Sequence, residues 1–230
     1  MGESEARGVI DAVRAARALG NRVGAGSRYV VLGYSQGGHA ALFANEIAAT
    51  WAPELTLVGT VAGAPVVELD TFVGELSPAF DWLKVLMVAG MEAVDPAAAP
   101  ATVLTPAGLD LFPVVDERCS TEVMAAYVAG GALEADLRTT PPFASRLAAD
   151  TPGQRPGASP VLLLGGGADE LIGADLLEQA LARLCSVGQV VERRTYPGVD
   201  HAESIAASLD DAVAWAKGAF TTTPTTSSCP

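Results

Sequence analysis

The sequence predicts an α/β protein with a mostly parallel sheet, and three observations support this prediction. Residues 28–32, 36–50 and 56–62 have the pattern of a strand, a helix and a second buried strand. A similar alternation of strand and helix returns in residues 161–196. Between the two lies a long stretch with helical periodicity and no strand alternation. Because a strand–helix–strand unit of this length crosses over between parallel strands, we expect a parallel sheet with a helical insertion.

Length, charge and hydrophobicity narrow the class of protein. A chain of 230 residues is long enough for one domain, or for one domain with a cap. Half of the residues are hydrophobic, which is typical of a globular protein. The net charge of −13 would repel phosphates, so no nucleic-acid partner is expected. The best candidate for a membrane span, residues 85–91, is too short for one, so we expect a buried helix there.

Residues 3–19 are predicted to form the first helix, and a glycine-rich turn follows it. Its apolar residues fall on one face, and Glu3 and Glu5 in its first turn suit the helix dipole. The residues before it lack a basic region followed by an apolar core, so no signal peptide is recognised. On that basis, a chain complete as given would be cytoplasmic.

Residues 67–151 form the predicted helical insertion. Helices are expected at 81–94, 104–112 and 121–129, with prolines between them. The stretch is longer than a crossover needs, which favours a helical cap or lid over an ordinary bundle of crossover helices.

The sheet pattern resumes after a turn-rich linker. A strand is expected at 161–164, a helix at 173–185, a strand at 189–196 and a last helix up to about residue 220. The threonine- and serine-rich end is expected to be loose except where Cys229 tethers it. We therefore divide the chain into a core of residues 1–66 and 152–220, a cap of residues 67–151 and a tail of residues 221–230.

The candidate nucleophile is Ser35, in a Gly-x-Ser-x-Gly motif between the first strand and the second helix. This context is that of a nucleophile elbow, a sharp turn that lifts the serine hydroxyl above the sheet edge. Gly33 and Gly37 are expected to be required because larger side chains would clash across the turn. The motif alone is weak evidence, and a chance loop is the alternative, but the sequence on both sides agrees with an elbow.

A serine hydroxyl needs an adjacent base, and the chain has two histidines. His39 follows Ser35 by about one helical turn, so we expect it to pack under the elbow. His201 follows the last strand, in a loop at the carboxyl edge where the serine also emerges. His201 is therefore the predicted general base.

The base needs a carboxylate that orients it, and Asp169 follows a buried strand through three glycines. The resulting order of serine, aspartate and histidine along the chain is that of the α/β-hydrolase fold. Glu170 and Asp175 are the alternatives, although Asp175 is more simply a helix-start residue. Asp200 adjoins His201, and neighbours in an extended loop usually point apart.

The oxyanion hole is predicted only in part. The backbone N–H of Gln36, the residue after the nucleophile, is one expected donor. A second donor normally comes from a loop after an earlier strand, and we expect no such loop because only one helix precedes the nucleophile strand. Since a lost donor costs about a hundredfold or more in rate, weak activity is one expected outcome. No metal site and no cofactor is predicted.

Four stretches carry a resemblance to a known family: residues 2–7, 33–41, 166–172 and 196–201. They resemble the secretory lipase family, typified by yeast lipase A and its actinobacterial relatives. The resemblance implies an α/β-hydrolase fold with a helical cap, a serine–aspartate–histidine triad and activity on carboxylic esters including acylglycerols. Matched motif by motif, it places the triad on Ser35, Asp169 and His201.

The resemblance also implies features outside the triad. Family members carry a signal peptide and several strands before the segment that starts here at Gly2, which implies a secreted protein and a sheet shortened on its N-terminal side. It further implies a disulfide between Cys185 and Cys229, with Cys119 unpaired. Three reduced cysteines in a cytosolic protein are the alternative. A sheet shortened in this way exposes an edge, so we expect dimerisation or aggregation.

The sequence thus predicts a serine esterase or lipase that acts on small ester or lipid substrates, most simply aliphatic acyl esters. The alternative is a truncated hydrolase remnant, weakly active or inactive, that serves as a binding or structural protein. A peptidase or acyltransferase on the same fold is a third reading, because fold does not fix substrate.

Overall fold

The computed structural model describes residues 1–127, 131–224 and 226–230. The chain divides into two compact units. The sheet unit comprises Gly2–Glu68 and Thr151–Pro230, and the helical unit comprises Leu69–Asp150 together with Met1. The predicted role of the helical residues as a cap stays a prediction.

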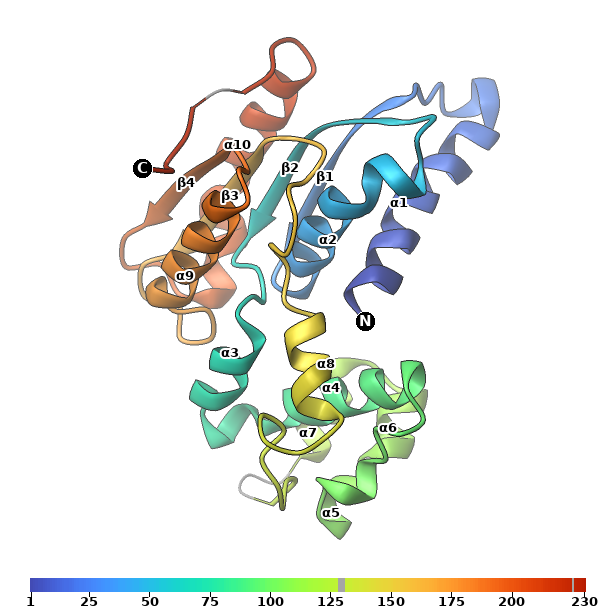
Figure 1. The fold of residues 1–230 in the computed structure, drawn as a ribbon, viewed down its shortest axis with the longest axis vertical. Coiled ribbons are helices and arrows are strands. Elements are labelled where there is room, and N and C mark those ends of the chain that lie inside the picture. Colours follow the sequence, from blue (N-terminus) through green and yellow to red (C-terminus); the bar gives the residue numbers. More distant parts are fainter. Residues whose placement is uncertain (128–130, 225) are drawn as a thin grey trace. The chain divides into compact units, whose positions relative to one another are not determined.

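In the described part of the sheet unit, four strands form one sheet in the order in which they occur along the chain. The strands are β1 (Arg28–Tyr34), β2 (Thr56–Gly63), β3 (Val161–Gly166) and β4 (Val191–Tyr196). All neighbours pair in parallel, so every strand ends at the same edge of the sheet (Figure 1). The predicted parallel sheet is confirmed.

Helices cover both faces of this sheet. Helices α1 (Gly2–Ala18), α2 (Gln36–Trp51) and α9 (Ala174–Ser186) lie on one face, and α10 (His201–Ala219) lies on the other (Figure 1). Strand residues alternate accordingly, because successive side chains of a strand point to opposite faces. Tyr29 and Val31 join the core beneath α2, whereas Leu162 and Leu164 pack with Trp215 of α10.

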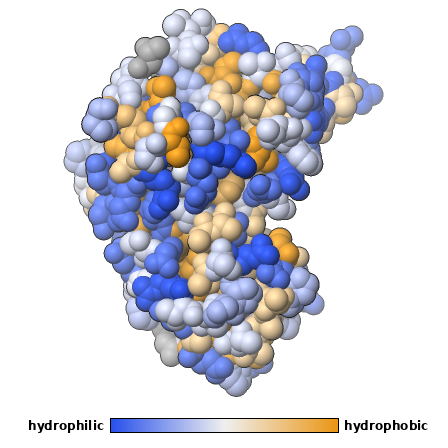
Figure 2. Space-filling model, in the orientation of Figure 1, coloured by the Kyte–Doolittle hydropathy of each residue, from blue (hydrophilic) through white to orange (hydrophobic). Residues whose placement is uncertain are grey.

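Helix α2 is buried nearly all round from Gly38 to Asn45, because α1 packs on the side that faces away from the sheet. Ala6 and Ile10 of α1 are fully buried in this contact. The outer surface of these helices carries hydrophilic and hydrophobic residues side by side (Figure 2). No helix in the described ranges is long and apolar enough to cross a bilayer.

The helical unit contains six α-helices among its described residues. They are α3 (Leu69–Glu75), α4 (Asp81–Val94), α5 (Pro106–Leu109), α6 (Phe112–Glu117), α7 (Ser120–Ala126) and α8 (Phe143–Ala149). Val88, Met91, Phe143 and Leu147 are fully buried there. The unit has a core of its own, which α4 and α8 help to form.

Two predictions for this unit need correction. The single helix expected at 104–112 is wrong, because Leu104 forms an isolated bridge with Leu133 and α5 ends at Leu109. The next helix starts at Phe112, with Pro113 in its first turn, where a missing N–H costs nothing. The helix expected at 121–129 ends at Ala126, and residues 128 and 129 lie outside the described ranges.

The end of the chain is attached to the sheet unit at Ser228 and Cys229, and a tether at Cys229 was expected. Ser228 donates its N–H to the Val191 carbonyl at 2.7 Å, and its Oγ accepts the N–H of Arg193 at 2.9 Å. Cys229 forms the disulfide with Cys185 that the resemblance implied. The tail therefore covers the outer edge of β4, while Cys119 is free and exposed.

Candidate active site

Ser35 lies between the end of β1 and the start of α2 with φ 56° and ψ −120°. A positive φ is costly for a residue other than glycine, and here it belongs to the predicted elbow. Gly33 is sterically required, because a Cβ there would lie 1.9 Å from the Gly37 carbonyl oxygen. The expectation for Gly37 is wrong, since a side chain there would meet open space. Gly38 is the tight position on the helix side, where a Cβ would come within 2.9 Å of Pro65.

The backbone of Ser35 is fixed from β2. Its N–H donates to the Gly63 carbonyl at 2.8 Å, and its carbonyl accepts the N–H of Val66 at 3.2 Å. These bonds tie the elbow to the end of the neighbouring strand, so the serine hydroxyl has a defined direction.

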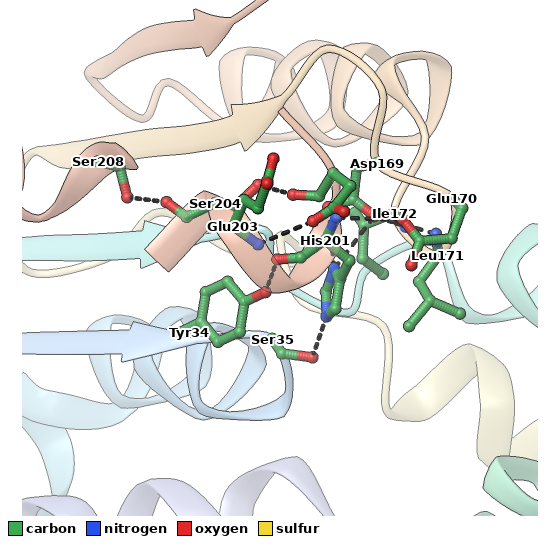
Figure 3. Close-up of polar contacts among 11 residues, drawn as sticks. Tyr34, Ser35, Asp169, Glu170, Leu171, Ile172, His201, Glu203, Ser204 and Ser208 are labelled. Carbon is green, nitrogen blue, oxygen red and sulfur yellow. Dashed lines mark hydrogen bonds and ion pairs between the residues drawn. The ribbon is translucent and has the colours of Figure 1, made fainter. Parts of the chain in front are cut away.

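His201 faces Ser35 from the end of β4, with His201 Nε2 and Ser35 Oγ 3.1 Å apart (Figure 3). The prediction placed His201 in a loop, but it is the first residue of α10. Asp200 is the N-cap of that helix, and its side chain accepts the N–H of Glu203 at 2.8 Å. The cap fixes where α10 begins, which directs the imidazole toward the elbow.

Asp169 lies on the other side of the imidazole, 2.9 Å from Oδ2 to His201 Nδ1 (Figure 3). Its side chain is fully buried, and Oδ1 accepts the N–H groups of Leu171 at 3.0 Å and Ile172 at 2.7 Å. The turn after β4 approaches closely, because a Cβ on Gly166 would lie 2.2 Å from the Val199 carbonyl oxygen. The glycines before Asp169 therefore allow it to meet His201.

The other candidates from the sequence have different surroundings. Glu170 is exposed and accepts the backbone N–H of His201 at 3.1 Å, so it supports the start of α10. Asp175 lies in the first turn of α9, as its alternative reading expected. His39 is buried in α2, where its Nδ1 is 2.9 Å from the Glu5 carboxylate. The structure brings none of these side chains to the Ser35 hydroxyl.

Tyr34 is a residue that the sequence reasoning missed. Its hydroxyl donates to the His201 carbonyl, and its ring lies 5.1 Å from the imidazole between centroids. Burial, and then the negative charges of Asp169, Glu170 and Asp200, raise the pKa of Tyr34 to about 12. The phenol therefore stays neutral and can donate at any ordinary pH. Its place directly before the nucleophile was the only available signal.

The backbone N–H of Gln36 is the first of α2, so helix geometry gives it no acceptor within the helix. It lies at the positive end of the helix dipole, where an anion is stabilised. No group of His, Cys, Asp or Glu suited to a metal ion occurs within the described ranges. The site therefore combines the contacts among Ser35, His201 and Asp169 with a backbone N–H, that of Gln36, which can stabilise a negative charge.

Comparisons with known proteins agree with this architecture. The sequence model of the secretory lipase family matches residues 1–228. A comparison with curated proteins gives no significant match.

Solved structures of lipases and esterases are similar in fold. Lipase A of Candida antarctica matches with a TM-score of 0.78 and 22% identity, over 93% of this chain and 54% of that one. The closed state of the same lipase matches with a TM-score of 0.81 and 22% identity, over 98% of this chain and 56% of that one. The rice cell wall degrading esterase LipA of Xanthomonas oryzae matches with a TM-score of 0.76 and 20% identity, over 94% of this chain and 66% of that one. The chain thus spans between half and two thirds of the length of these proteins, with an α/β-hydrolase fold.

Proposed function

The chain belongs to the secretory lipase family, and from this premise we propose that it hydrolyses carboxylic esters through an acyl-enzyme on Ser35. One observation carries the proposal: a continuous contact runs from Ser35 Oγ through the His201 imidazole to the buried Asp169 carboxylate. A serine in this arrangement has the adjacent base that nucleophilic attack requires.

In the proposed reaction, Ser35 Oγ attacks the ester carbonyl carbon while His201 Nε2 takes the hydroxyl proton. The N–H of Gln36 stabilises the oxyanion, and the alcohol leaves with the proton from His201. Water then attacks the acyl-enzyme by the same route and releases the acid. Asp169 accepts the Nδ1–H of His201, which keeps Nε2 free to act as the base and stabilises the imidazolium.

Aliphatic acyl esters, acylglycerols among them, are the proposed substrates. The support is the family's description and the names of the similar lipases and esterases. Secretion is proposed on the same basis, and the disulfide between Cys185 and Cys229 suits an oxidising compartment.

Release of p-nitrophenol from short- and medium-chain esters tests the activity. The parent protein should turn over, and Ser35→Ala should reduce the rate to that of the buffer. Equal rates for the two proteins would contradict the mechanism.

A second candidate function is a non-catalytic hydrolase domain, because among the described residues the Gln36 N–H is the one oxyanion donor that the elbow supplies. This candidate predicts slow labelling of Ser35 by a fluorophosphonate without turnover of any ester. Turnover that depends on Ser35 would exclude it.

Self-association is also part of the proposal. Among the described strands, β1 pairs with β2 alone, so its other edge has unpaired backbone groups. Leu32 on that strand is 47% exposed, and Ile205, Leu209 and Val213 form an exposed stripe on α10. Leu32, Ile205 and Leu209 line one shallow groove. A second copy that pairs along β1 would cover this edge and the apolar side chains beside it.

A further inference from the structure

The carboxylate of Glu5 connects α1 to the first turn of α2, directly after the proposed nucleophile. Its Oε1 accepts a hydrogen bond from Gln36 Nε2 at 2.8 Å. Its Oε2 is 2.9 Å from Nδ1 of His39. Gln36 and His39 are the first and fourth residues of α2, so one side chain spans the whole first turn.

The His39 end of this contact is tightly packed, whereas the bond to Gln36 is exposed. The His39 side chain is 6% exposed, and its ring is 4.9 Å from the Phe43 ring between centroids. A Cβ on Gly2 would come within 2.4 Å of Phe43, so the start of α1 lies directly on α2. Burial raises the pKa of Glu5, but its hydrogen bonds to His39 and Gln36 and the charge of His39 outweigh burial and lower it. Glu5 is therefore a carboxylate at neutral pH, suited to accept both bonds.

The first turn of α2 lacks the support that a helix start usually has. Ser35 occupies the N-cap position, where a serine side chain normally accepts a backbone N–H of the first turn. Among the described contacts it makes no such bond, and its Oγ faces His201 instead. The residue that would cap the helix is thus the proposed nucleophile, and it has a positive φ besides. Without a side-chain cap, this turn is held by the backbone bonds of Ser35 and by side chains from outside α2, of which Glu5 is one.

We propose that Glu5 is a positioning residue for the reaction, and this inference rests on the proposed function. By binding Gln36 and His39, Glu5 fixes the first turn of α2 against α1. The fixed turn aims the Gln36 N–H at the developing oxyanion and holds Ser35 at the angle that His201 requires. Glu5 does this without touching the substrate.

Three variants test the inference in the full chain. Glu5→Ala removes both bonds, and Glu5→Gln keeps the shape and one acceptor oxygen. Glu3→Ala is the matched control, because it removes a carboxylate from the same turn of α1 that contacts Arg7 and Arg155 rather than α2. Steady-state kinetics on p-nitrophenyl butyrate give kcat and KM for each protein, and titration with a fluorophosphonate counts the reactive serines.

Glu5→Ala should lower kcat by between about tenfold and a hundredfold per titrated serine, with KM changed less than about twofold, because a misaimed group costs that much in rate. Glu5→Gln should recover part of kcat, and Glu3→Ala should match the parent. A kcat for Glu5→Ala equal to or above the parent's would overturn the inference. So would a loss of rate that the smaller number of titratable serines explains fully, because Glu5 would then serve folding alone.

Amide hydrogen exchange at His39 and the residues that follow it in α2, whose N–H groups bond to carbonyls of the first turn, provides a readout that needs no turnover. Exchange at these amides should be about tenfold faster in Glu5→Ala, and unchanged in Glu3→Ala, because the first turn opens locally. A parent without esterase activity would refute the proposed function, and the exchange would still decide whether Glu5 holds this turn. Unchanged exchange in Glu5→Ala would overturn the inference in either case.

Discussion

Asp169 and Glu170 are neighbouring carboxylates with different surroundings, and these surroundings separate their roles. Asp169 is fully buried and accepts two backbone N–H groups in addition to its contact with His201 Nδ1. Glu170 is exposed and accepts only the backbone N–H of His201 among the described contacts. The first arrangement orients an imidazole, and the second supports a helix start.

Substitution of each residue by its amide should separate these roles. Asp169→Asn should lower kcat by about four orders of magnitude, because an amide NH₂ facing Nδ1 favours the wrong tautomer of His201. Glu170→Gln should cost at most about fivefold, because the amide oxygen still accepts the same N–H and only a charge near the helix start is lost. Ester hydrolysis by the two purified variants is the measurement, and equal losses would refute Asp169 as the orienting carboxylate.

Tyr34 is the residue before the proposed nucleophile, and its hydroxyl donates to the backbone carbonyl of the proposed base, His201. Its pKa is raised from 10.0 to about 12, so its contribution to stability is complete below pH 10 and is lost as the pH rises toward 12. In Tyr34→Phe, the free energy of unfolding should therefore depend less on pH between these values. An absorbance titration of the folded Tyr34→Phe protein should also show one tyrosine fewer among those that ionise near pH 12. An unchanged titration curve would contradict the buried, hydrogen-bonded phenol.

At the scale of elements, the tail and α9 stabilise the outer side of the sheet. The disulfide joins Cys185 and Cys229 across 44 residues, and Ser228 pairs with β4. In the chain-entropy view, closing a loop of that length stabilises the fold by about 4 kcal/mol. In urea unfolding, Cys229→Ser should lower the free energy of unfolding by about that much. Cys119→Ser, at an exposed free cysteine, should leave the free energy of unfolding measurably unchanged. Equal stability of the two variants would show that the tail contributes no constraint.

The elements around the site were predictable because each combines a hydrophobic period with clear end signals. The helix expected at 81–94 is found at Asp81–Val94, and the strand expected at 56–62 extends by one residue to Gly63. These segments are long or strongly apolar, so local sequence decides their structure. Ser35, His201 and Asp169 were proposed on the same basis. Ser35 directly follows β1, and the other two lie in the segments after β3 and β4 of one parallel sheet.

Other features depend on contacts that local sequence does not encode. The stretch at 104–112 has helical periodicity, yet Leu104 pairs with Leu133, α5 ends at Leu109 and the next helix begins at Phe112. The steric need at Gly38, rather than Gly37, comes from Pro65 after the next strand. The contact of Glu5 with Gln36 and His39 depends on how α1 packs on α2, which the helix pattern alone does not give.

At the scale of the whole molecule, the two sides of the sheet differ. Ser228 pairs with the start of β4 at one edge. At the other, β1 pairs on one side only among the described strands, and its Leu32 adjoins the exposed stripe of Ile205, Leu209 and Val213. An apolar edge strand without lysine or proline favours pairing with another strand.

Self-association through β1 should therefore appear in light scattering at micromolar concentration as a dimer or a larger species. Leu209→Lys should shift the population toward monomer, because a charge in the covered stripe would lose its hydration. Val190→Lys, at an exposed apolar position that precedes β4, is the matched control and should leave the size distribution unchanged. A parent that is monodisperse as a monomer would contradict this proposal.

The central claim is that Ser35 is a nucleophile activated by His201. Its most direct test is the reaction of the full chain with a fluorophosphonate, followed by peptide mass spectrometry to locate the adduct and by the labelling rate. We predict one adduct, on Ser35, and a rate at least about a hundredfold lower in His201→Ala, since the general base is lost. An adduct on another residue, or an undiminished rate in His201→Ala, would contradict the claim.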